Sequence, residues 1–264
     1  MNDASLKGRH VLITGSTSGI GQGIAEAFAD AGCTLTINGL GESGHIERLV
    51  DDLAGRSGAA VAHHGADMRE PAQIEHLMRD AVNARGPVDI LVNNAGIQHV
   101  APLGEFPTER WDAIIAINLS SAFHTTRLAL PAMMDAGWGR IVNIASAHAL
   151  RASPFKVAYV AAKHGIAGLT KTAALEAATS GVTVNAIAPG YVETPLVAGQ
   201  VADTARARGI TEEEVLRDVM LLAQPTRRLV GIGECAALAL FLCTEGAASI
   251  TGTVLPVDGG WTAK

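Results

Sequence analysis

Short apolar runs alternate with segments of helical periodicity along nearly the whole chain, and this alternation restricts the possible folds more than any other feature. Continuous apolar runs typical of buried strands occupy residues 11–13, 33–38, 59–63, 88–93, 140–145, 182–188 and 253–257. Helical spacing of apolar residues marks six further segments. They are 20–31, 74–82, 111–134, 157–178, 233–243 and a helix that contains 46–53. Strands connected in this way pair in parallel through right-handed crossovers. The sequence therefore predicts one α/β domain over residues 1–264, a doubly wound parallel sheet with helices on both faces.

Residues 191–225 interrupt this alternation, because they are polar and helical in propensity and contain no apolar run of the strand type. Open α/β sheets bind ligands at the carboxyl ends of their strands, near the point where the strand order reverses. The segment follows the predicted strand at 182–188, so it begins at that edge of the sheet. We expect it to form a lid over a binding site.

Composition indicates a globular protein and argues against two classes of partner. Hydrophobic residues make up 48% of the 264 residues and charged residues 17%, which is enough for one sizeable core. The net charge of −6 gives no support for nucleic-acid binding, which needs clustered lysine and arginine. No apolar run reaches the ~18–20 residues needed to span a bilayer, so we expect no membrane partner.

The cysteines and the N-terminal residues both favour the cytoplasm. Cys33, Cys235 and Cys243 are odd in number and scattered, and they form neither a CxxC pair nor a metal-ligand cluster. Buried thiols in a reducing compartment are the expected state. Residues 1–8 are polar and lack the apolar segment of a secretory signal. We expect a cytoplasmic protein without a metal site.

A glycine-rich loop joins the first predicted strand to the first predicted helix. Gly15, Gly19 and Gly21 allow a tight turn and a close approach of the helix N-terminus to a pyrophosphate, with Thr17, Ser18 and Ile20 between them. Three glycines in a loop are weak evidence alone, and a merely tight turn is the alternative. Their place between a strand and a helix favours nucleotide binding.

The end of the second strand indicates which dinucleotide binds. An acid there often holds the ribose hydroxyls of NAD, but this chain has Asn38, Gly39 and Leu40. Neither residues 16–18 nor residues 38–44 contain an arginine or lysine that could pair with the 2′-phosphate of NADP. A phosphate without a cation is less favourable than a ribose held by neutral groups, so NAD is the predicted cofactor.

The next two strand ends supply further candidate contacts with the adenosine. Asp67, followed by Met68, could accept a hydrogen bond from the adenine amine, although its spacing to Glu70 also fits a helix capping box. Small residues allow close approach to the ribose after the fourth strand, where a simple turn is the alternative; they are Asn94, Ala95 and Gly96.

The candidate catalytic residues are Ser146 at a strand end, Tyr159 at a helix start and Lys163 one turn later on the same helix face. Oxidation of an alcohol needs a base, and a tyrosine with a pKa near 10 is a poor one at neutral pH. An ammonium about 4 Å away contributes roughly 4 kcal/mol at an effective dielectric of about 20, which lowers that pKa by about three units. Ser146 could hold the substrate oxygen, and Asn118 could complete a proton path through a water molecule. Taken singly, the tyrosine could be an aromatic residue at a boundary and the lysine a residue on a solvated helix face. Together and in this order, they favour a catalytic site.

These motifs, in this order, resemble those of the short-chain dehydrogenases/reductases. The matching residues are Thr14, Gly15, Gly19, Gly21, Asn93, Asn94, Ala95, Gly96, Asn118, Ser146, Tyr159, Lys163, Pro189 and Gly190. The resemblance covers essentially the whole chain and implies a single Rossmann domain and a homotetramer. It also implies that Tyr159 is the acid/base, that Lys163 binds the nicotinamide ribose, and that Pro189, Gly190 and Val192 contact the cofactor.

Within that family, residues 94–99, 145–148, 156–163 and 257–261 are similar to the bacterial members that oxidise 3-hydroxybutyrate. That similarity implies NAD-dependent, reversible conversion of (R)-3-hydroxybutyrate to acetoacetate. The neutral end of the second strand is similar too, so the missing acid does not count against NAD.

The residues around Tyr159 fit a small carboxylate substrate. Lys156 lies three positions before the tyrosine, and His148 lies two after Ser146, on the same side if the chain is extended there. Gln98 follows the fourth strand, and Gln200 lies in the predicted lid. One cation and three hydrogen-bonding groups describe a carboxylate pocket. The alternatives are an exposed lysine at a helix start and a histidine satisfied within its loop.

Other functions remain open at this point. A reductase of 3-oxoacyl thioesters in the same family would more often use NADPH, and a sugar or polyol dehydrogenase would have little use for Lys156. A non-catalytic nucleotide-sensing module on the same fold is the alternative outside enzymes, since a fold does not determine function.

Overall fold

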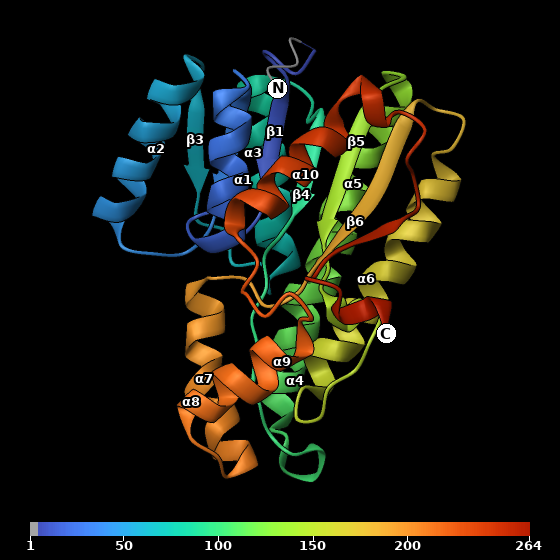
Figure 1. The fold of residues 1–264 in the computed structure, drawn as a ribbon. Helices are drawn as coiled ribbons and strands as arrows, with labels where there is room; N and C mark the ends of the chain where they lie inside the picture. The colour runs from blue at the N-terminus through green and yellow to red at the C-terminus, as the bar shows by residue number, and fades with distance from the viewer. Residues whose placement is uncertain (1–4) are drawn as a thin grey trace.

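The computed structural model describes residues 5–264; residues 1–4 of the polar N-terminal stretch lie outside the described residues. One seven-stranded sheet forms its centre, with every neighbouring pair parallel and the order β3-β2-β1-β4-β5-β6-β7 (Figure 1). The strands are β1 (His10–Ile13), β2 (Thr34–Asn38), β3 (Val61–His64), β4 (Ile90–Asn93), β5 (Gly139–Ile144), β6 (Val182–Pro189) and β7 (Val254–Val257). Each coincides with a predicted run to within two residues, because buried parallel strands are apolar on both faces.

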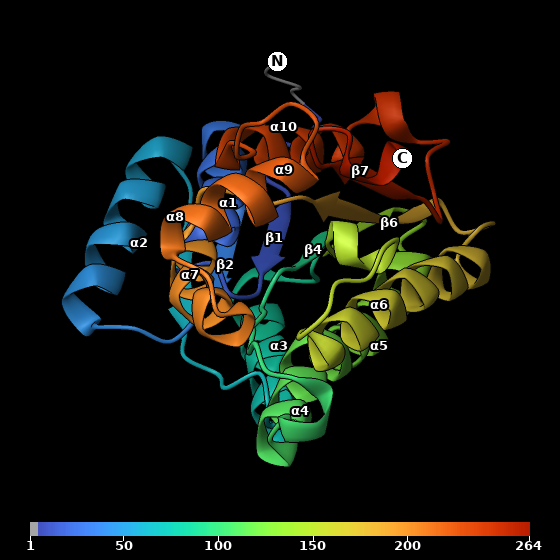
Figure 2. The same cartoon turned by 60° about the horizontal axis from the view of Figure 1, so that its bottom comes forward.

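Helices cover both faces of the sheet, as Figure 2 shows. One face is covered by α1 (Gly19–Asp30), α2 (Ser43–Ser57) and α10 (Ile232–Cys243), and the other by α3 (Pro71–Arg85), α5 (Ser121–Asp135) and α6 (Val157–Glu176). Short 3-10 turns are η1 (Leu103–Glu105), η3 (Ala147–Ala149), η5 (Glu245–Ala247) and η6 (Trp261–Ala263). Separate apolar cores lie on the two faces. The predicted doubly wound α/β fold is confirmed.

The long helix expected over residues 111–134 is divided in the structure. It consists of α4 (Thr108–Ile115), a π-helical segment η2 (Ala116–Ser120) and α5. Within η2, the side chain of Asn118 bonds with the backbone of Ile97 in both directions, at 2.9 and 3.0 Å. Apolar spacing does not reveal a single wide turn, which is often found at functional sites.

The excursion after β6 is helical, as expected, and Figure 1 shows it beyond the carboxyl ends of the strands. It contains α7 (Pro195–Arg208), α8 (Glu212–Glu214), a π-helical segment η4 (Val215–Met220) and α9 (Leu221–Ala223). A small apolar cluster of its own includes Tyr191, Val201, Val215 and Met220. Its two ends meet in an isolated parallel bridge between Val192 and Val230.

Two further expectations concern the cysteines and membrane-spanning segments. Cys33, Cys235 and Cys243 are free and buried, as predicted. Among residues 5–264, the helices are too short or too polar to cross a membrane.

Candidate active site

A cavity of about 380 Å³ lies at the carboxyl ends of the strands, where β1 and β4 are neighbours and the strand order reverses. Its wall includes every predicted site residue except Gly21, Gln98 and Asn118. The sheet forms one side and α7 the other. The structure thus brings together residues that are far apart in the sequence, because parallel strands end at one edge.

At one end of the cavity, the first turn of α1 presents backbone N–H groups. Gly15 and Gly19 have φ angles of 61° and 57°, and the N-cap residue Ser18 makes no side-chain capping bond. Ser18, Gly19 and Ile20 line the cavity, so the N–H groups that a helix start leaves unpaired lie beside it. This arrangement suits a pyrophosphate.

Gly21 lies outside the cavity wall, and close packing accounts for it. A Cβ there would lie 2.3 Å from Asn94 Nδ2 and from Gly15 O. Asn94 Nδ2 donates to the carbonyls of Thr14 (3.0 Å) and Gly15 (2.7 Å). The third glycine therefore lets the end of β4 hold the loop.

Asn38 at the end of β2 is a structural residue that the sequence did not identify. It is fully buried; its Oδ1 accepts from Gly15 N–H at 3.3 Å, and its Nδ2 donates to the carbonyls of His64 (2.9 Å) and Ala66 (3.0 Å). The side chain thus joins β2, the end of β3 and the glycine loop. Leu40, 66% exposed, completes this end of the cavity wall.

Asp67 is not the helix cap that its spacing to Glu70 allowed. Helix α3 begins at Pro71 with Glu70 as N-cap, because proline occupies the first helical position without losing a hydrogen bond. Asp67 instead accepts from Arg69 N–H and forms an ion pair with the Arg69 guanidinium, at 2.9 and 2.5 Å. Hydrogen bonds from Arg69 hold the pKa of this carboxyl below its usual range. It lines the cavity beside Met68.

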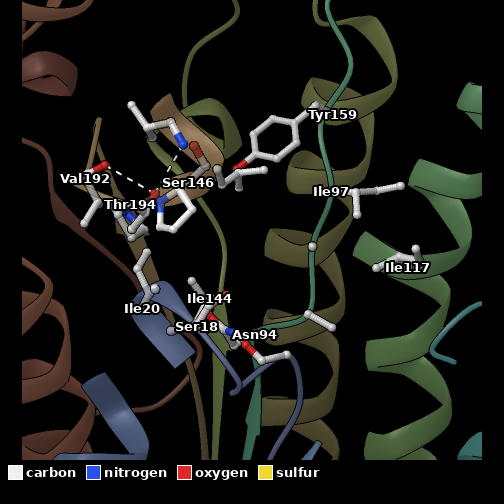
Figure 3. Close-up of a pocket in the computed structure, with 18 of the residues that line it drawn as sticks. Ser18, Ile20, Asn94, Ile97, Ile117, Ile144, Ser146, Tyr159, Val192 and Thr194 are labelled. Carbon is white, nitrogen blue, oxygen red and sulfur yellow. Dashed lines mark hydrogen bonds between the residues drawn. The ribbon is translucent and has the colours of Figure 1, made fainter. Parts of the chain in front are cut away.

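At the other end of the cavity, Tyr159 on α6 reaches toward Ser146 at the end of β5 (Figure 3). Ser146 Oγ accepts from His148 N–H at 3.1 Å and lies 3.3 Å from His148 Nδ1. The extended chain on which the placement of His148 was based is not found here, because Ser146 caps the 3-10 turn η3. That turn still directs His148 into the cavity.

The pKa of Tyr159 moves opposite to the expected direction. Burial raises it, and a hydrogen bond with Ser146 opposes that rise. Lys163 donates to Ile144 O at 2.7 Å, and its Nζ lies 5.5 Å from the Tyr159 ring centroid. Burial also lowers the pKa of Lys163 to about 8. Desolvation of the phenol therefore acts against the lowering that was expected from the Lys163 ammonium and the charge of the nicotinamide ring.

Lys156 carries a cation into the wall of the cavity. As the N-cap residue of α6 it is 5% exposed, so the alternative of a solvated lysine is wrong. Its Nζ donates to Gln200 Oε1 at 2.9 Å and to the Tyr191 hydroxyl at 3.5 Å. Burial, and then the charge of Arg208, lower its pKa to about 8.

Two of the predicted polar contacts carry atoms without a hydrogen-bond partner among the described residues. His148 Nε2 is one, and burial followed by the charge of Lys156 lowers the pKa of that ring to about 3. The other two are the amide oxygen and nitrogen of Gln98. Gln98 lines a neighbouring pocket of about 220 Å³ that shares Pro195, Leu196 and Gln200 with the main cavity. Buried polar atoms left unpaired in this way suit contact with a polar ligand.

Comparison with known proteins agrees with this geometry. The profile of the family described as "Enoyl-(Acyl carrier protein) reductase" matches residues 15–262. The chain is 57% identical over 253 residues to a D-beta-hydroxybutyrate dehydrogenase of Rhizobium meliloti, covering 96% of this chain and 98% of that one. It is 54% identical over 259 residues to the protein of that name from Cupriavidus necator, covering 98% and 100%. The chain belongs to the short-chain dehydrogenase/reductase family.

A solved structure of the same family confirms the fold. A variant of actinorhodin polyketide ketoreductase with NADPH superimposes with a TM-score of 0.91 at 33% identity, over 100% of both chains. Dehydrogenases of this family use a nicotinamide cofactor, and the residues present fit one. The uncapped first turn of α1 suits the pyrophosphate, and the cavity extends from Leu40 to Ser146.

The family motifs leave out part of the cavity wall. Tyr191 and Trp261 stack with ring centroids 5.1 Å apart and planes 14° apart. Trp261 and His148 form a T-shaped pair with ring centroids 5.1 Å apart. Thr194, which caps α7, also lines the wall; its Oγ1 donates to Val192 O (Figure 3). No periodicity marks Tyr191 or Thr194, and only the turn-forming residues after β6 signal that the chain bends there. Trp261 lies in the segment 257–261 that resembles the members of the family that oxidise 3-hydroxybutyrate.

Proposed function

We propose that this dehydrogenase oxidises (R)-3-hydroxybutyrate to acetoacetate with NAD, reversibly. The buried ammonium of Lys156 is the observation that carries the proposal. A carboxylate is the ligand that best compensates a desolvated lysine, since charge-assisted hydrogen bonds are the strong ones. The names of the two relatives that match over nearly the whole chain support the same substrate.

The chain's own residues would divide the chemistry at the reacting carbon. Tyr159 removes the hydroxyl proton as the C3–H bond breaks, and Ser146 donates a hydrogen bond to the substrate oxygen. NAD, when bound, supplies the hydride acceptor and a positive ring charge that favours the phenolate. Lys163 binds the nicotinamide ribose, and its ammonium lies on the same helix as Tyr159. Asn118, whose side chain holds Ile97, remains a proposed support of the proton path.

The remaining polar groups would hold the carboxylate away from the reacting carbon. Lys156 provides the charge, and Gln200, His148 and Gln98 provide hydrogen bonds. The low pKa of His148 keeps its ring neutral at working pH, so the ring adds no charge to the pocket. Because Lys156 is the one cation among these four groups, they favour a monocarboxylate.

The cofactor is proposed to be NAD rather than NADP. Of the described residues in the cavity wall, only Lys156 and Lys163 are cations, and both lie at the reaction end. Leu40, Asp67 and Met68 offer no positive charge to a 2′-phosphate. The nearby cation Arg69 is already paired with the Asp67 carboxylate. The backbone of Gly15, Gly19 and Ile20 would contact the pyrophosphate.

Reduction of a 3-oxoacyl thioester is the second candidate. The family description and the fit to a ketoreductase solved with NADPH favour it. It leaves the buried Lys156 without a negatively charged partner. Turnover of acetoacetate with NADH, compared with turnover of an acetoacetyl thioester with NADPH, separates the two. A sensing module would show neither.

The proposal extends to assembly, location and the lid. Exposed Trp111 on α4 and Phe123 on α5 are large apolar side chains that subunit contacts would cover in a homotetramer. Three buried, unpaired thiols fit the cytoplasm. Residues 191–225 would close over the substrate through the contact of Gln200 with Lys156.

Steady-state assays with both hands of 3-hydroxybutyrate and with NAD or NADP test the proposal. It requires NAD reduction with the (R) acid and little with the (S) acid. Preference for a neutral alcohol over the acid would contradict it.

A further inference from the structure

Gln224 lies outside the cavity wall and yet connects both ends of the segment 191–225. It is fully buried at the end of α9. Its Oε1 accepts a hydrogen bond from Tyr191 N–H at the start of the segment, and its Nε2 donates to Arg228 O beyond the end. A single amide group thus satisfies one backbone donor and one backbone acceptor that lie 37 positions apart in the chain, Tyr191 and Arg228.

The neighbouring backbone closes around this amide. Tyr191 O accepts from Val230 N–H at 2.8 Å, so both polar backbone groups of Tyr191 are bonded. A Cβ on Gly190 would lie 2.1 Å from Gln224 Oε1, which explains why that position is glycine. Thr226 N–H donates to Gly259 O at 3.1 Å and ties the C-terminal residues to the same point.

Tyr191 carries the effect of this arrangement into the cavity. Its hydroxyl is one of the two side-chain oxygens that accept from Lys156, and its ring stacks on Trp261, which in turn meets His148. A change in the Tyr191 backbone would therefore move the groups around the proposed carboxylate site. Displacements of about 1 Å in a positioning group can cost about a hundredfold in rate.

We propose that Gln224 is a positioning residue that fixes Tyr191, and through it the substrate end of the cavity. The inference rests on the proposed function, because it concerns the groups that would hold the carboxylate. Gln224 touches neither substrate nor cofactor in this account; it acts through the Tyr191 backbone.

Asn185 offers a matched control. It is buried at 1% exposure, its Nδ2 donates to Ile250 O at 2.6 Å, and its Oδ1 accepts from Thr253 N–H at 3.3 Å. It is also an amide that bridges two backbone segments, and it lies outside the cavity wall. Gln224→Met and Asn185→Leu each replace such an amide with an apolar side chain of similar size.

The test compares thermal stability, KM for (R)-3-hydroxybutyrate and affinity for NAD in the two variants. Both should unfold at lower temperature, since each leaves buried backbone groups unpaired. Only Gln224→Met should raise KM, by about tenfold, with a smaller change in NAD affinity. Equal effects of the two variants on KM, or none for Gln224→Met, would overturn the proposal.

Hydrogen exchange in the ligand-free protein decides the proposal even if the substrate is not 3-hydroxybutyrate. The Tyr191 amide should exchange slowly in the wild type and in Asn185→Leu, and rapidly in Gln224→Met. Slow exchange in Gln224→Met would show that Gln224 does not hold it. If Gln224→Met does not fold, Gln224→Glu keeps an acceptor for Tyr191 and loses the donor to Arg228. In Gln224→Glu, the backbone amides that follow Arg228 should exchange fast while the Tyr191 amide stays protected. An exchange pattern unchanged from that of the wild type would refute the role.

Discussion

The ammonium of Lys156 lies 2.9 Å from the amide oxygen of Gln200, so the helix that carries Tyr159 is joined to α7 across the cavity. A buried lysine with a neutral partner is only partly compensated, since an amide oxygen carries no full charge. A carboxylate entering the cavity would meet this ammonium first. The relationship links substrate binding to the position of α7.

Lys156→Ala should raise KM for 3-hydroxybutyrate strongly and change turnover of a neutral secondary alcohol little. Loss of a charge-assisted hydrogen bond costs about 2 kcal/mol, which corresponds to roughly thirtyfold in KM. Lys171→Ala, at an exposed position of the same helix, is the control and should leave both unchanged. An equal loss on acid and alcohol would remove the carboxylate role.

The same lysine predicts how KM depends on pH. Burial lowers its pKa to about 8, so the free enzyme carries the ammonium below that pH and loses it above. KM for the acid should be constant below pH 8 and rise above it, measured at saturating NAD. In Lys156→Arg the rise should vanish, since a guanidinium stays charged. A wild-type KM that is flat through pH 9.5 would contradict the assignment.

Leu40→Arg should allow the enzyme to use NADP. Leu40 is exposed and lines the adenosine end of the cavity, where no cation of the described wall lies. A guanidinium there can pair with a 2′-phosphate, and we expect a gain in kcat/KM for NADP of about tenfold or more. Leu40→Gln is the uncharged control. If both variants behave like the wild type, the 2′ position does not lie beside residue 40.

Asn143→Leu should lower stability without altering KM. Asn143 donates to Thr170 Oγ1 at 2.9 Å and accepts from Asn93 Nδ2 at 2.9 Å, and Thr125 donates to Asn93 Oδ1 at 2.6 Å. Breaking such a buried network should cost about 3 kcal/mol in the free energy of unfolding, measured with urea. Asn83→Leu on exposed α3 surface should cost little. A loss no larger than that of the control would mean that the network is dispensable.

The sequence predicted the strands, the covering helices and most of the cavity wall, for one physical reason. Apolar runs mark strands buried on both faces, and parallel strands end at one edge, so Gly15, Ser146 and Pro189 had to meet. Lys156 could also be placed, because it lies one turn before Tyr159.

Pairwise interactions between distant segments could not be read from the sequence. Asn38 stands where an acid often holds the ribose hydroxyls, but its amide bonds to three backbone groups. The spacing of Asp67 to Glu70 fits a helix cap, but in the structure Asp67 forms an ion pair with Arg69. The pKa of Tyr159 depends on burial, which a short motif does not record. Gln224 has no sequence signal at all.

The central claim is that Tyr159 takes a proton from the C3 hydroxyl while a hydride passes to NAD. Absorbance at 340 nm, followed in a single turnover with (R)-3-hydroxybutyrate, tests it most directly in the wild type and in Tyr159→Phe. The account predicts a rise for the wild type and none for Tyr159→Phe, with NAD binding retained because the phenol contacts no phosphate. A comparable rise in Tyr159→Phe, or no rise in a folded wild type saturated with NAD, would contradict it.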